Sequence, residues 1–458
     1  MSAVTVIGAS PSGLAAAAYL ARAGLRVTVL EAEAAPGGTC AGPTAPPGFA
    51  ALDPQAIKDL KLNKLGLRFA ERDLPLVALR PGAALVLGRD AHEAHRSIAA
   101  LSLRDADRYV ESRRELFAFA RVLRALWWDD GTLESEAERK ELQRWRVTSA
   151  ASWLESVFET EALKAAFAFD ALSGGLSPAE AGSALVLLWR AAQEMCGLQG
   201  AVAIPRQGPA TLVAALTAAA EAAGAEIRCG APVAQLRLEG DRVTGAVLAS
   251  GEILAAEAVL SSLPRRKTLL GLLPPGAPGF AAAKQLERMQ QSGEARLVLA
   301  LKALPPVFSQ PGRFVLADRL EGCAAAHAEA RAGKLPSELA LEAVAHDGLL
   351  SVTIRPLPVV PEGDANDFAA RLTLAVLHRL EPYAPELKAN LTGFTLVPPK
   401  PCAPLCVTQM LAPWRERIAT PLGGLYLCGE AAEPMPAVSL RAARHAAALA
   451  VRQLKEAR

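Results

Sequence analysis

Glycine, serine and glutamate residues near the N-terminus are spaced as if to bind a phosphate-containing ligand. Gly8, Ser10 and Gly13 lie between an apolar run, Ala3 to Ile7, and an Ala- and Leu-rich helical stretch, Pro11 to Ala23. In a dinucleotide-binding fold the first glycine allows a tight turn, the second lets the backbone approach the pyrophosphate, and the third lets the helix pack on the strand. Ser10 takes the second place, where its Cβ intrudes on the phosphate path although its hydroxyl can donate to a phosphate oxygen. The segment predicts a dinucleotide site.

Two neighbouring residues refine this prediction. Pro11 at the first helical position is tolerated, but it removes one N–H donor from the anion site at the helix N-terminus. Glu31 directly follows a second apolar run, Arg26 to Leu30. A carboxylate there accepts hydrogen bonds from the adenosine ribose and repels a 2′-phosphate, which favours FAD or NAD over NADP.

The elements that must position these residues begin with a β-α-β unit, which predicts a parallel sheet and an α/β fold. A helix over Thr211 to Ala223 then leads into a β-meander. Further strands are expected at Ala258 to Ser261 and Gly424 to Cys428, and a closing helix runs from about Ser439 to Leu454. The strands predicted for the meander are Glu226 to Arg228, Val233 to Glu239 and Arg242 to Leu248.

The middle of the chain, about Asp105 to Trp145, has the pattern of long amphipathic helices that carry Trp127, Trp128 and Trp145. We interpret them as a solvated helix pair that covers the core. The alternative is a surface that rests on a membrane.

Composition restricts the class of function. The chain has 458 residues and a formal net charge of +2, with its lysines and arginines scattered rather than gathered in a basic stripe, so nucleic acid is not an expected partner. The apolar runs are too short to span a membrane, no cationic leader precedes the first strand, and the seven cysteines fit reduced thiols. We therefore expect a soluble, cytoplasmic protein, with peripheral membrane contact as the most that the pattern allows.

The histidines show no spacing that indicates a metal site, so no metal is expected. His92 and His95 share a helical face, but no third ligand is evident. The six histidines are His92, His95, His327, His346, His378 and His445.

Motifs at both ends of the chain resemble the flavin amine oxidase and phytoene desaturase superfamily. They are Glu31 followed by Gly37-Gly38, and Gly424 to Glu430 near the C-terminus. Shorter matches resemble the branch of phytoene desaturase-like proteins that includes the mitochondrial pyridine nucleotide-disulfide oxidoreductase domain proteins. These shorter matches are Pro47-Gly48-Phe49, Ile57 to Leu62, Gly66-Leu67, Arg72-Asp73 and Leu101 to Ala106.

The resemblance implies FAD as the cofactor, bound in a Rossmann-like domain of the glutathione reductase type, doubly wound and with a β-meander. It implies that Glu31 binds the adenosine ribose, that Gly37 and Gly38 pass close to the pyrophosphate, and that the backbone of Val233 meets the adenine. It further implies that Gly429 and Glu430 face the pyrophosphate and the ribityl chain. Val438 would then lie beside the isoalloxazine ring, with His445 on the helix behind it.

The chain departs from this branch where glycines usually surround the flavin. A Pro-Gly-Gly-Gly-Val loop is replaced by Pro434-Met435-Pro436-Ala437-Val438, and a Gly-Ala-x-Gly-Arg-Asn segment by residues 440–445, in which Arg444 is kept. Each lost glycine adds a side chain where backbone should approach the ring, and Pro436 also lacks an N–H donor. Together with Ser10, these changes fall on the expected cofactor surface.

Three functions remain open from the sequence. The first is an FAD-dependent oxidoreductase that removes hydride from a hydrophobic or amine substrate, with dioxygen, a quinone or another protein as electron acceptor. The second is a binding or scaffold protein that keeps the fold but has weakened or lost FAD. The third is a redox-neutral isomerase that uses the flavin without net oxidation. The residues that would carry catalysis are not identified, and neither is the oligomeric state.

The domain organisation expected is discontinuous. Residues 1–70, 205–265 and 415–458 would form the FAD-binding domain, and residues 71–204 and 266–414 an α+β substrate domain interleaved with it.

Overall fold

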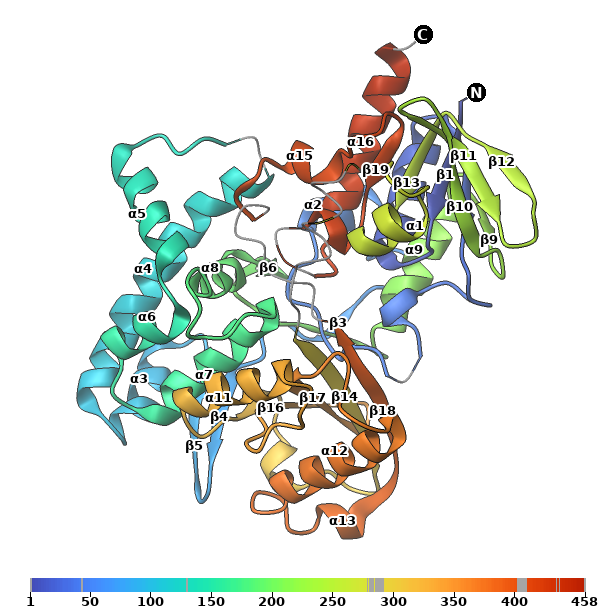
Figure 1. The fold of residues 1–458 in the computed structure, drawn as a ribbon. Helices are drawn as coiled ribbons and strands as arrows, with labels where there is room; N and C mark the ends of the chain where they lie inside the picture. The colour runs from blue at the N-terminus through green and yellow to red at the C-terminus, as the bar shows by residue number, and fades with distance from the viewer. Residues whose placement is uncertain are drawn as a thin grey trace.

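The fold is taken from a computed structural model of the chain (Figure 1). It describes residues 2–42, 44–128, 131–277, 279, 284, 292–401, 410–433, 435 and 437–456. Pro434, Pro436, Cys402 and Cys406 lie outside the described residues.

A five-stranded parallel sheet forms the part of the molecule next to both termini (Figure 1). The order of its strands is β19 (Leu425–Leu427), β13 (Ala258–Ser261), β1 (Ala3–Ile7), β2 (Arg26–Leu30) and β9 (Glu226–Arg228). Its inner strands β13 and β1 and the edge strand β19 are apolar and almost entirely buried, because both faces of the sheet are covered, whereas the other edge strand, β9, is partly exposed.

Helices pack on one face of this sheet and a β-meander on the other. Alanines let α1 (Pro11–Arg22) approach α9 (Ala210–Ala222) and α16 (Arg441–Glu456) closely in one hydrophobic cluster. Leu236, Val243 and Leu248 of the meander pack with Ile7 and Leu30 in a second cluster. The result is a three-layer arrangement. The meander strands are β10 (Val233–Glu239), β11 (Arg242–Leu248) and β12 (Ile253–Ala255).

A seven-stranded sheet is the centre of the other half of the molecule (Figure 1). Its strands are antiparallel except for the parallel pair β4 and β15. The order is β18 (Leu391–Pro401), β14 (Gly293–Leu301), β17 (Leu349–Leu357), β16 (Leu341–His346), β15 (Arg313–Leu316), β4 (Leu76–Arg80) and β5 (Ala83–Leu87).

Helices cover this second sheet on both sides. Phe368, Leu372 and Val376 of α12 (Ala365–Leu380) pack on it in one cluster, while Leu163 and Phe169 of α7 (Glu161–Ala171) belong to another. The remaining helices here are α3 (Ala91–Ala99), α4 (Leu103–Trp128), α5 (Glu136–Val147), α6 (Ala150–Val157), α8 (Ala184–Ala192), α11 (Leu320–Arg331) and α13 (Leu387–Asn390).

Short elements join the two halves. Strand β3 (Phe69–Glu71) pairs with β8 (Ile204–Pro205), and β6 (Glu194–Met195) with β7 (Leu198–Gln199). Helices α2 (Pro54–Asp59) and α15 (Trp414–Ile418) lie beside α16 (Figure 1). The two halves thus contact each other through segments that are far apart in the sequence.

The fold confirms the α/β class and the parallel sheet predicted from the sequence. The predicted meander is wrong in one strand: Glu226–Arg228 (β9) pairs in parallel with β2 at the edge of the five-stranded sheet, and the third meander strand is Ile253–Ala255 (β12). Two element boundaries also differ from the prediction. Gly424 has φ +75° and Leu440 has φ +66°, so the last strand begins at Leu425 rather than Gly424, and the closing helix at Arg441 rather than Ser439. Left-handed backbone fits neither a strand nor a right-handed helix.

The tryptophans of the middle helices point into the protein. Trp127 is fully buried, and Trp128 and Trp145 are nearly so, packed in one cluster with apolar residues of α8. This agrees with helices that cover a core, as the amphipathic pattern suggested. Among the described residues, no helix is long and apolar enough to cross a bilayer.

Candidate functional site

We call the N-terminus of α1, from its cap Ser10 to Ser12, the mouth of α1. It presents backbone N–H and hydroxyl groups that can bind an anion. Ser10 caps the helix, because its Oγ accepts a hydrogen bond of 3.3 Å from the backbone N–H of Gly13. The hydroxyl hydrogen of Ser10 stays available to a ligand, since its oxygen is the acceptor in that bond. Within the described part of the chain, the N–H groups of Ser10 and Ser12 donate to no other residue. The mouth therefore retains donors even though Pro11 supplies none.

The turn before α1 needs its two glycines for conformation and packing. Gly8 has φ +88°, and its N–H donates to the carbonyl of Leu30 at 2.8 Å. A Cβ on Gly13 would lie 2.0 Å from the carbonyl oxygen of Gly8. The helix start is thus held directly against the turn.

Glu31 is fixed beside this turn by two backbone hydrogen bonds. Its Oε2 accepts from Ala9 N at 2.6 Å, and its Oε1 accepts from Glu33 N at 3.0 Å. A carboxylate oxygen can accept more than one bond, so Glu31 can still accept from a ligand hydroxyl. Ala231 N donates to the carbonyl of Glu31 at 2.8 Å, which holds the segment just before Val233 alongside.

Gly37 and Gly38 form a loop across the mouth of α1. Gly37 N donates to the carbonyl of Ala9 at 2.9 Å, and both glycines have positive φ, +135° and +54°. A Cβ on Gly38 would lie 3.4 Å from the Cβ of Ser10. The loop and the helix cap are therefore in close contact, and any ligand at the mouth of α1 meets both.

The end of β19 reaches the same edge of the sheet. A Cβ on Gly429 would lie 2.5 Å from the carbonyl oxygen of Ser262, so only glycine fits there. Glu430, the next residue, has solvent-accessible surface, yet surrounding protein removes enough hydration to raise the pKa of its carboxyl, and Glu294 adds to this effect. The side chain of Glu430 is exposed in the structure, so a ligand can reach its carboxyl.

The charge of Glu430 acts on the thiol of Cys40, and the charge of Glu294 in β14 acts on Glu430. Burial raises the pKa of Cys40 to about 12, with the charge of Glu430 as the second cause, and burial lowers the pKa of Arg296. Nη1 of Arg296 donates to the carbonyl of Thr44 at 3.1 Å. Glu294 pairs with Arg355 at 3.0 Å. Glu294 and Arg296, both in β14, thus lie where the two halves of the molecule meet.

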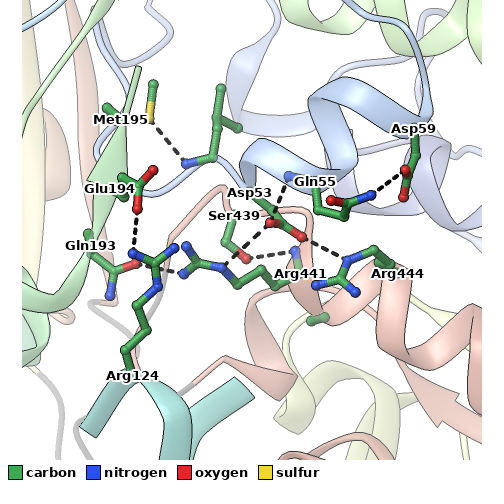
Figure 2. A network of polar contacts seen from close by, with 12 residues as sticks. Asp53, Gln55, Asp59, Arg124, Gln193, Glu194, Met195, Ser439, Arg441 and Arg444 are labelled. Atoms are coloured by element: carbon green, nitrogen blue, oxygen red, sulfur yellow. Dashed lines mark hydrogen bonds and ion pairs between the residues drawn. The ribbon is translucent and has the colours of Figure 1, made fainter. Parts of the chain in front are cut away.

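A buried polar network surrounds the start of α16 (Figure 2). Asp53 caps α2 by accepting from Gln55 N, and its other oxygen accepts from Nε of Arg444 at 2.8 Å. Arg441, 2% exposed, lies 4.0 Å from Asp53 and donates to Gln193 at 3.1 Å. The network fixes α16 against α2 and the segment after α8.

Glu433 lies at the N-terminus of α16. Ser439 donates to its carboxyl, and Ala442 N donates to it at 3.3 Å. Burial raises the pKa of Glu433 to about 7, against the lowering effects of Ser439 and Arg441. The first turn of α16 therefore already has a hydrogen-bond acceptor from the same chain.

Aromatic and cationic groups of α4, α15 and α16 itself pack around His445 of α16. The ring of Trp128 stacks with His445 at 6.2 Å and has the guanidinium groups of Arg417 and Arg441 at 5.0 and 5.4 Å from its centre. Trp414 also contacts His445, at 4.4 Å between ring centres. His445 thus belongs to a packed aromatic group.

Met435, Ala437 and Leu440 stand where related sequences carry glycine. The structure accommodates their side chains in two ways. The side chain of Met435 is 2% exposed and packs in the tryptophan cluster, and Ala437 packs against the same cluster. Leu440 keeps the left-handed backbone that suits a glycine, at φ +66°, and is fully buried. Non-glycine residues in that region carry a strain of about 1–2 kcal/mol. Val438 is partly buried beside the first cluster.

These residues fit an FAD molecule. The free N–H groups of Ser10 and Ser12 suit a pyrophosphate, and the fixed carboxylate of Glu31 suits a ribose. Ser10 does not block the mouth of the helix with its hydroxyl, which is turned to the backbone of Gly13.

Comparison with known proteins gives the family. A model of the family described as FAD dependent oxidoreductase matches residues 3–263. The chain therefore belongs to the FAD dependent oxidoreductase family, whose cofactor is FAD.

Relatives among known sequences agree with this assignment. Pyridine nucleotide-disulfide oxidoreductase domain-containing protein 2 of Rattus norvegicus is 28% identical, over 98% of this chain and 93% of the rat protein. Phytoene dehydrogenase of Streptomyces griseus is 32% identical, over 59% of this chain and 56% of its own length. The chain is thus homologous to phytoene desaturases, as its motifs suggested.

Solved structures share the fold. An oxidoreductase from Methanosarcina mazei superposes with a TM-score of 0.63 at 17% identity and covers 99% of this chain and 100% of that one. Cyclohexylamine oxidase from Brevibacterium oxydans superposes with a TM-score of 0.62 at 16% identity, over 99% of each chain. At such identities the likeness extends to the fold alone.

The sequence did not reveal several polar residues near this site. Asp53, Glu433, Gln193 and Arg296 were not singled out, because each is brought to the site by contacts that are remote in the sequence. Only Asp53 had a local signal: an aspartate followed by proline is typical of a helix start, which α2 confirms.

Proposed function

We propose that this chain is an active FAD-dependent oxidoreductase that removes hydride from a hydrophobic or amine substrate. One observation supports this most: unbonded N–H groups at the mouth of α1 lie beside the Glu31 carboxylate, which Ala9 N holds in place. A pyrophosphate and its ribose need this pair of groups side by side.

We assign the cofactor-binding roles from the family resemblance, which this geometry supports. In this proposal Gly8, Ser10 and Gly13 receive the pyrophosphate and Glu31 binds the adenosine ribose, with the backbone of Val233 at the adenine. On the flavin side Gly37 and Gly38 cover the pyrophosphate, Gly429 and Glu430 face the ribityl chain, and Val438 borders the ring.

Bound FAD supplies the two-electron acceptor for the reaction. The chain's own residues then position the substrate and limit the access of water. Arg296 and Glu294 place charge at the junction of the two halves, and the tryptophan cluster closes the side near α16. No acid–base residue is assigned.

The proposed domains are those expected from the sequence, an FAD-binding domain of residues 1–70, 205–265 and 415–458 and a substrate domain of residues 71–204 and 266–414. The first contains all five strands of the parallel sheet. The strands of the seven-stranded sheet all lie in the second. We also propose a cytoplasmic location and a small-molecule substrate.

The test is a redox titration of the purified protein. The protein should be yellow, lose its colour with dithionite under anaerobic conditions and regain it in air. Reduction by a substrate from a panel of amines and apolar compounds would then establish hydride removal. Flavin that is bound but never reduced by any organic compound would argue against the enzymatic part of the proposal.

A second candidate is a binding or scaffold protein that has weakened or lost FAD. Met435 and Leu440 favour it, because both place side chains where the related sequences carry glycine. This candidate predicts a colourless protein that does not take up added FAD.

A further inference from the structure

A pocket lies in the half of the molecule that contains the seven-stranded sheet. Its walls come from β4 and β5, from helices α4, α6, α7 and α8, and from β15. Its cavity volume is about 120 Å³, and the pocket is partly open to solvent.

One wall of the pocket is aromatic. Phe158 and Phe167 stack at 6.1 Å between ring centres, Tyr109 contacts Phe167 at 6.4 Å, and Trp153 meets Phe158 edge-on at 6.4 Å. A Cβ on Gly200, which has φ +72°, would lie 2.8 Å from the ring of Phe117, so a larger residue here would displace that ring. These surfaces suit the apolar body of a ligand.

The other part of the lining is cationic. Four arginines and two aspartates line the pocket, which gives the lining a formal charge of +2. The lining arginines are Arg89, Arg113, Arg190 and Arg313, and the aspartates are Asp73 and Asp170.

Two of these arginines are neutralised by carboxylates. Arg89 pairs with Asp73 at 2.6 Å, and Arg313 pairs with Asp170 and Glu342, both at 2.5 Å. Burial opposes the charge of Asp170, but Arg313 and Arg190 outweigh it and lower the pKa of its carboxyl. Both aspartates of the lining are therefore already engaged as anions.

The other two arginines have no carboxylate partner among the described residues. Arg113 donates to the carbonyls of Gly88 and Arg89 at 3.2 Å and lies over the ring of Phe117 at 5.2 Å. Arg190 makes no hydrogen bond or ion pair within the part of the chain that the structure describes, and its Nη1 is buried without a partner.

Arg190 is attracted by the carboxylates of Asp170, Glu342 and Asp73, but none of them forms a hydrogen bond or ion pair with it in the described part of the chain. Arg190 lies near the end of α8, otherwise a helix of buried apolar residues. Burial and the charge of Arg313 lower the pKa of its guanidinium to about 10 against the raising effects of Asp170, Glu342 and Asp73, so it stays protonated at neutral pH. A buried donor without an acceptor is unfavourable by roughly 1–3 kcal/mol, and more for a charged group. An anionic ligand would remove that penalty.

We propose that this pocket binds a small amphipathic carboxylate, with its aromatic or aliphatic body against Phe167 and Trp153 and its carboxylate on Arg190, assisted by Arg113. The positive lining disfavours a cationic amine here. The proposal makes no use of the flavin, so its failure would leave the oxidoreductase function untouched.

Isothermal titration of the full chain with three matched probes tests the proposal. Phenylbutyrate, phenylbutanol and phenylbutylamine share one apolar body and differ in the charge of the head group. We expect phenylbutyrate to bind about tenfold or more tightly than phenylbutanol, and phenylbutylamine most weakly. Equal affinity for the acid and the alcohol, tighter binding of the amine, or no binding of the acid would overturn the proposal.

Variants then locate the carboxylate. Arg190→Met keeps an apolar stem and should weaken phenylbutyrate binding about tenfold while the affinity for phenylbutanol stays the same, which also shows that the pocket is folded. Arg114→Met, an exposed arginine of α4 outside the pocket lining, is the matched control and should change neither affinity. An unchanged affinity of Arg190→Met for phenylbutyrate would place the carboxylate elsewhere and contradict the assignment.

Discussion

Glu31 accepts a hydrogen bond of 2.6 Å from the backbone N–H of Ala9, within the turn that leads into α1. The bond joins the end of β2 to the start of the first helix and holds a carboxylate beside the unbonded N–H groups of Ser10 and Ser12. The two parts of a dinucleotide that carry the most polar groups, sugar and pyrophosphate, therefore have their acceptor and donors in one place.

Replacing Glu31 by glutamine should weaken FAD binding about tenfold or more, because hydrogen bonds to a charged group contribute about 1.5–3 kcal/mol. Folding should be retained, since the amide oxygen can still accept from Ala9 N and only the bond from Glu33 N, at an exposed residue, is lost. The measurement is the dissociation constant of FAD from the quenching of flavin fluorescence. Glu33→Gln, two residues away and exposed, is the control. Equal affinities of the two variants would remove Glu31 from the site.

Ser10→Val should lower the affinity for FAD about tenfold or more, whereas Ser10→Gly should keep it. Valine adds bulk close to Gly38 and lacks the hydroxyl that caps α1, while glycine leaves space and lowers helix stability by only a few tenths of a kcal/mol. The same fluorescence titration measures both variants. If the valine variant bound FAD like the natural protein, the pyrophosphate could not lie against Ser10.

Gly13→Ala should destabilise the fold by about 3 kcal/mol or prevent folding, because its Cβ would lie 2.0 Å from the carbonyl oxygen of Gly8. Gly24→Ala is the comparison. It has φ +84° but no atom within 4 Å of the new Cβ, so only backbone strain of about 1 kcal/mol is expected. Urea unfolding followed by circular dichroism measures the difference, and similar losses in both variants would refute the packing argument.

Asp53→Asn should reduce the free energy of unfolding by about 3–5 kcal/mol, since it leaves Arg444 and the buried Arg441 without their carboxylate. Asparagine still caps α2, so the helix start is not the cause of the loss. Asp367→Asn, which breaks an exposed pair with Arg371, should have only a small effect. Chemical denaturation gives both values, and a loss at Asp53 as small as that at Asp367 would speak against the network.

The titration of the Glu433 carboxyl should make the free energy of unfolding fall as pH rises. Its pKa is raised from 4.5 to about 7 in the folded protein, so the folded state keeps a proton that the unfolded state releases between these values. The contribution of Glu433 to the free energy of unfolding is greatest below pH 4.5. It falls by about 3 kcal/mol as pH rises to 7. In Glu433→Gln this loss should be absent, while other groups titrate as before. Parallel unfolding curves of protein and variant across this pH range would contradict the assignment.

The first β-α-β unit could be predicted almost to the residue, because it depends on local patterns. Apolar runs, an Ala-rich helix and the glycine turn all lie within the first thirty or so residues, and β1 and β2 match their predicted bounds. The end of the chain was less predictable. Leu440 adopts the left-handed backbone of a glycine, which no local pattern of a buried leucine indicates.

The polar networks and the arginine-lined pocket could not be predicted, because they join distant segments. Asp53 and Arg444 are 391 residues apart in the chain, and Arg313 and Asp170 are 143 apart. Hydrophobic periodicity gives the buried face of each element but not its partner. The charged residues at these contacts therefore looked like solvent-exposed ones in the sequence.

The central claim is that the mouth of α1 and Glu31 hold FAD. Its most direct test is the flavin content of the protein, purified from cells supplied with riboflavin and freed of loose cofactor by gel filtration, then read from its absorption spectrum. We expect close to one FAD per chain, released only on denaturation. A colourless protein that stays colourless after incubation with excess FAD would contradict the account.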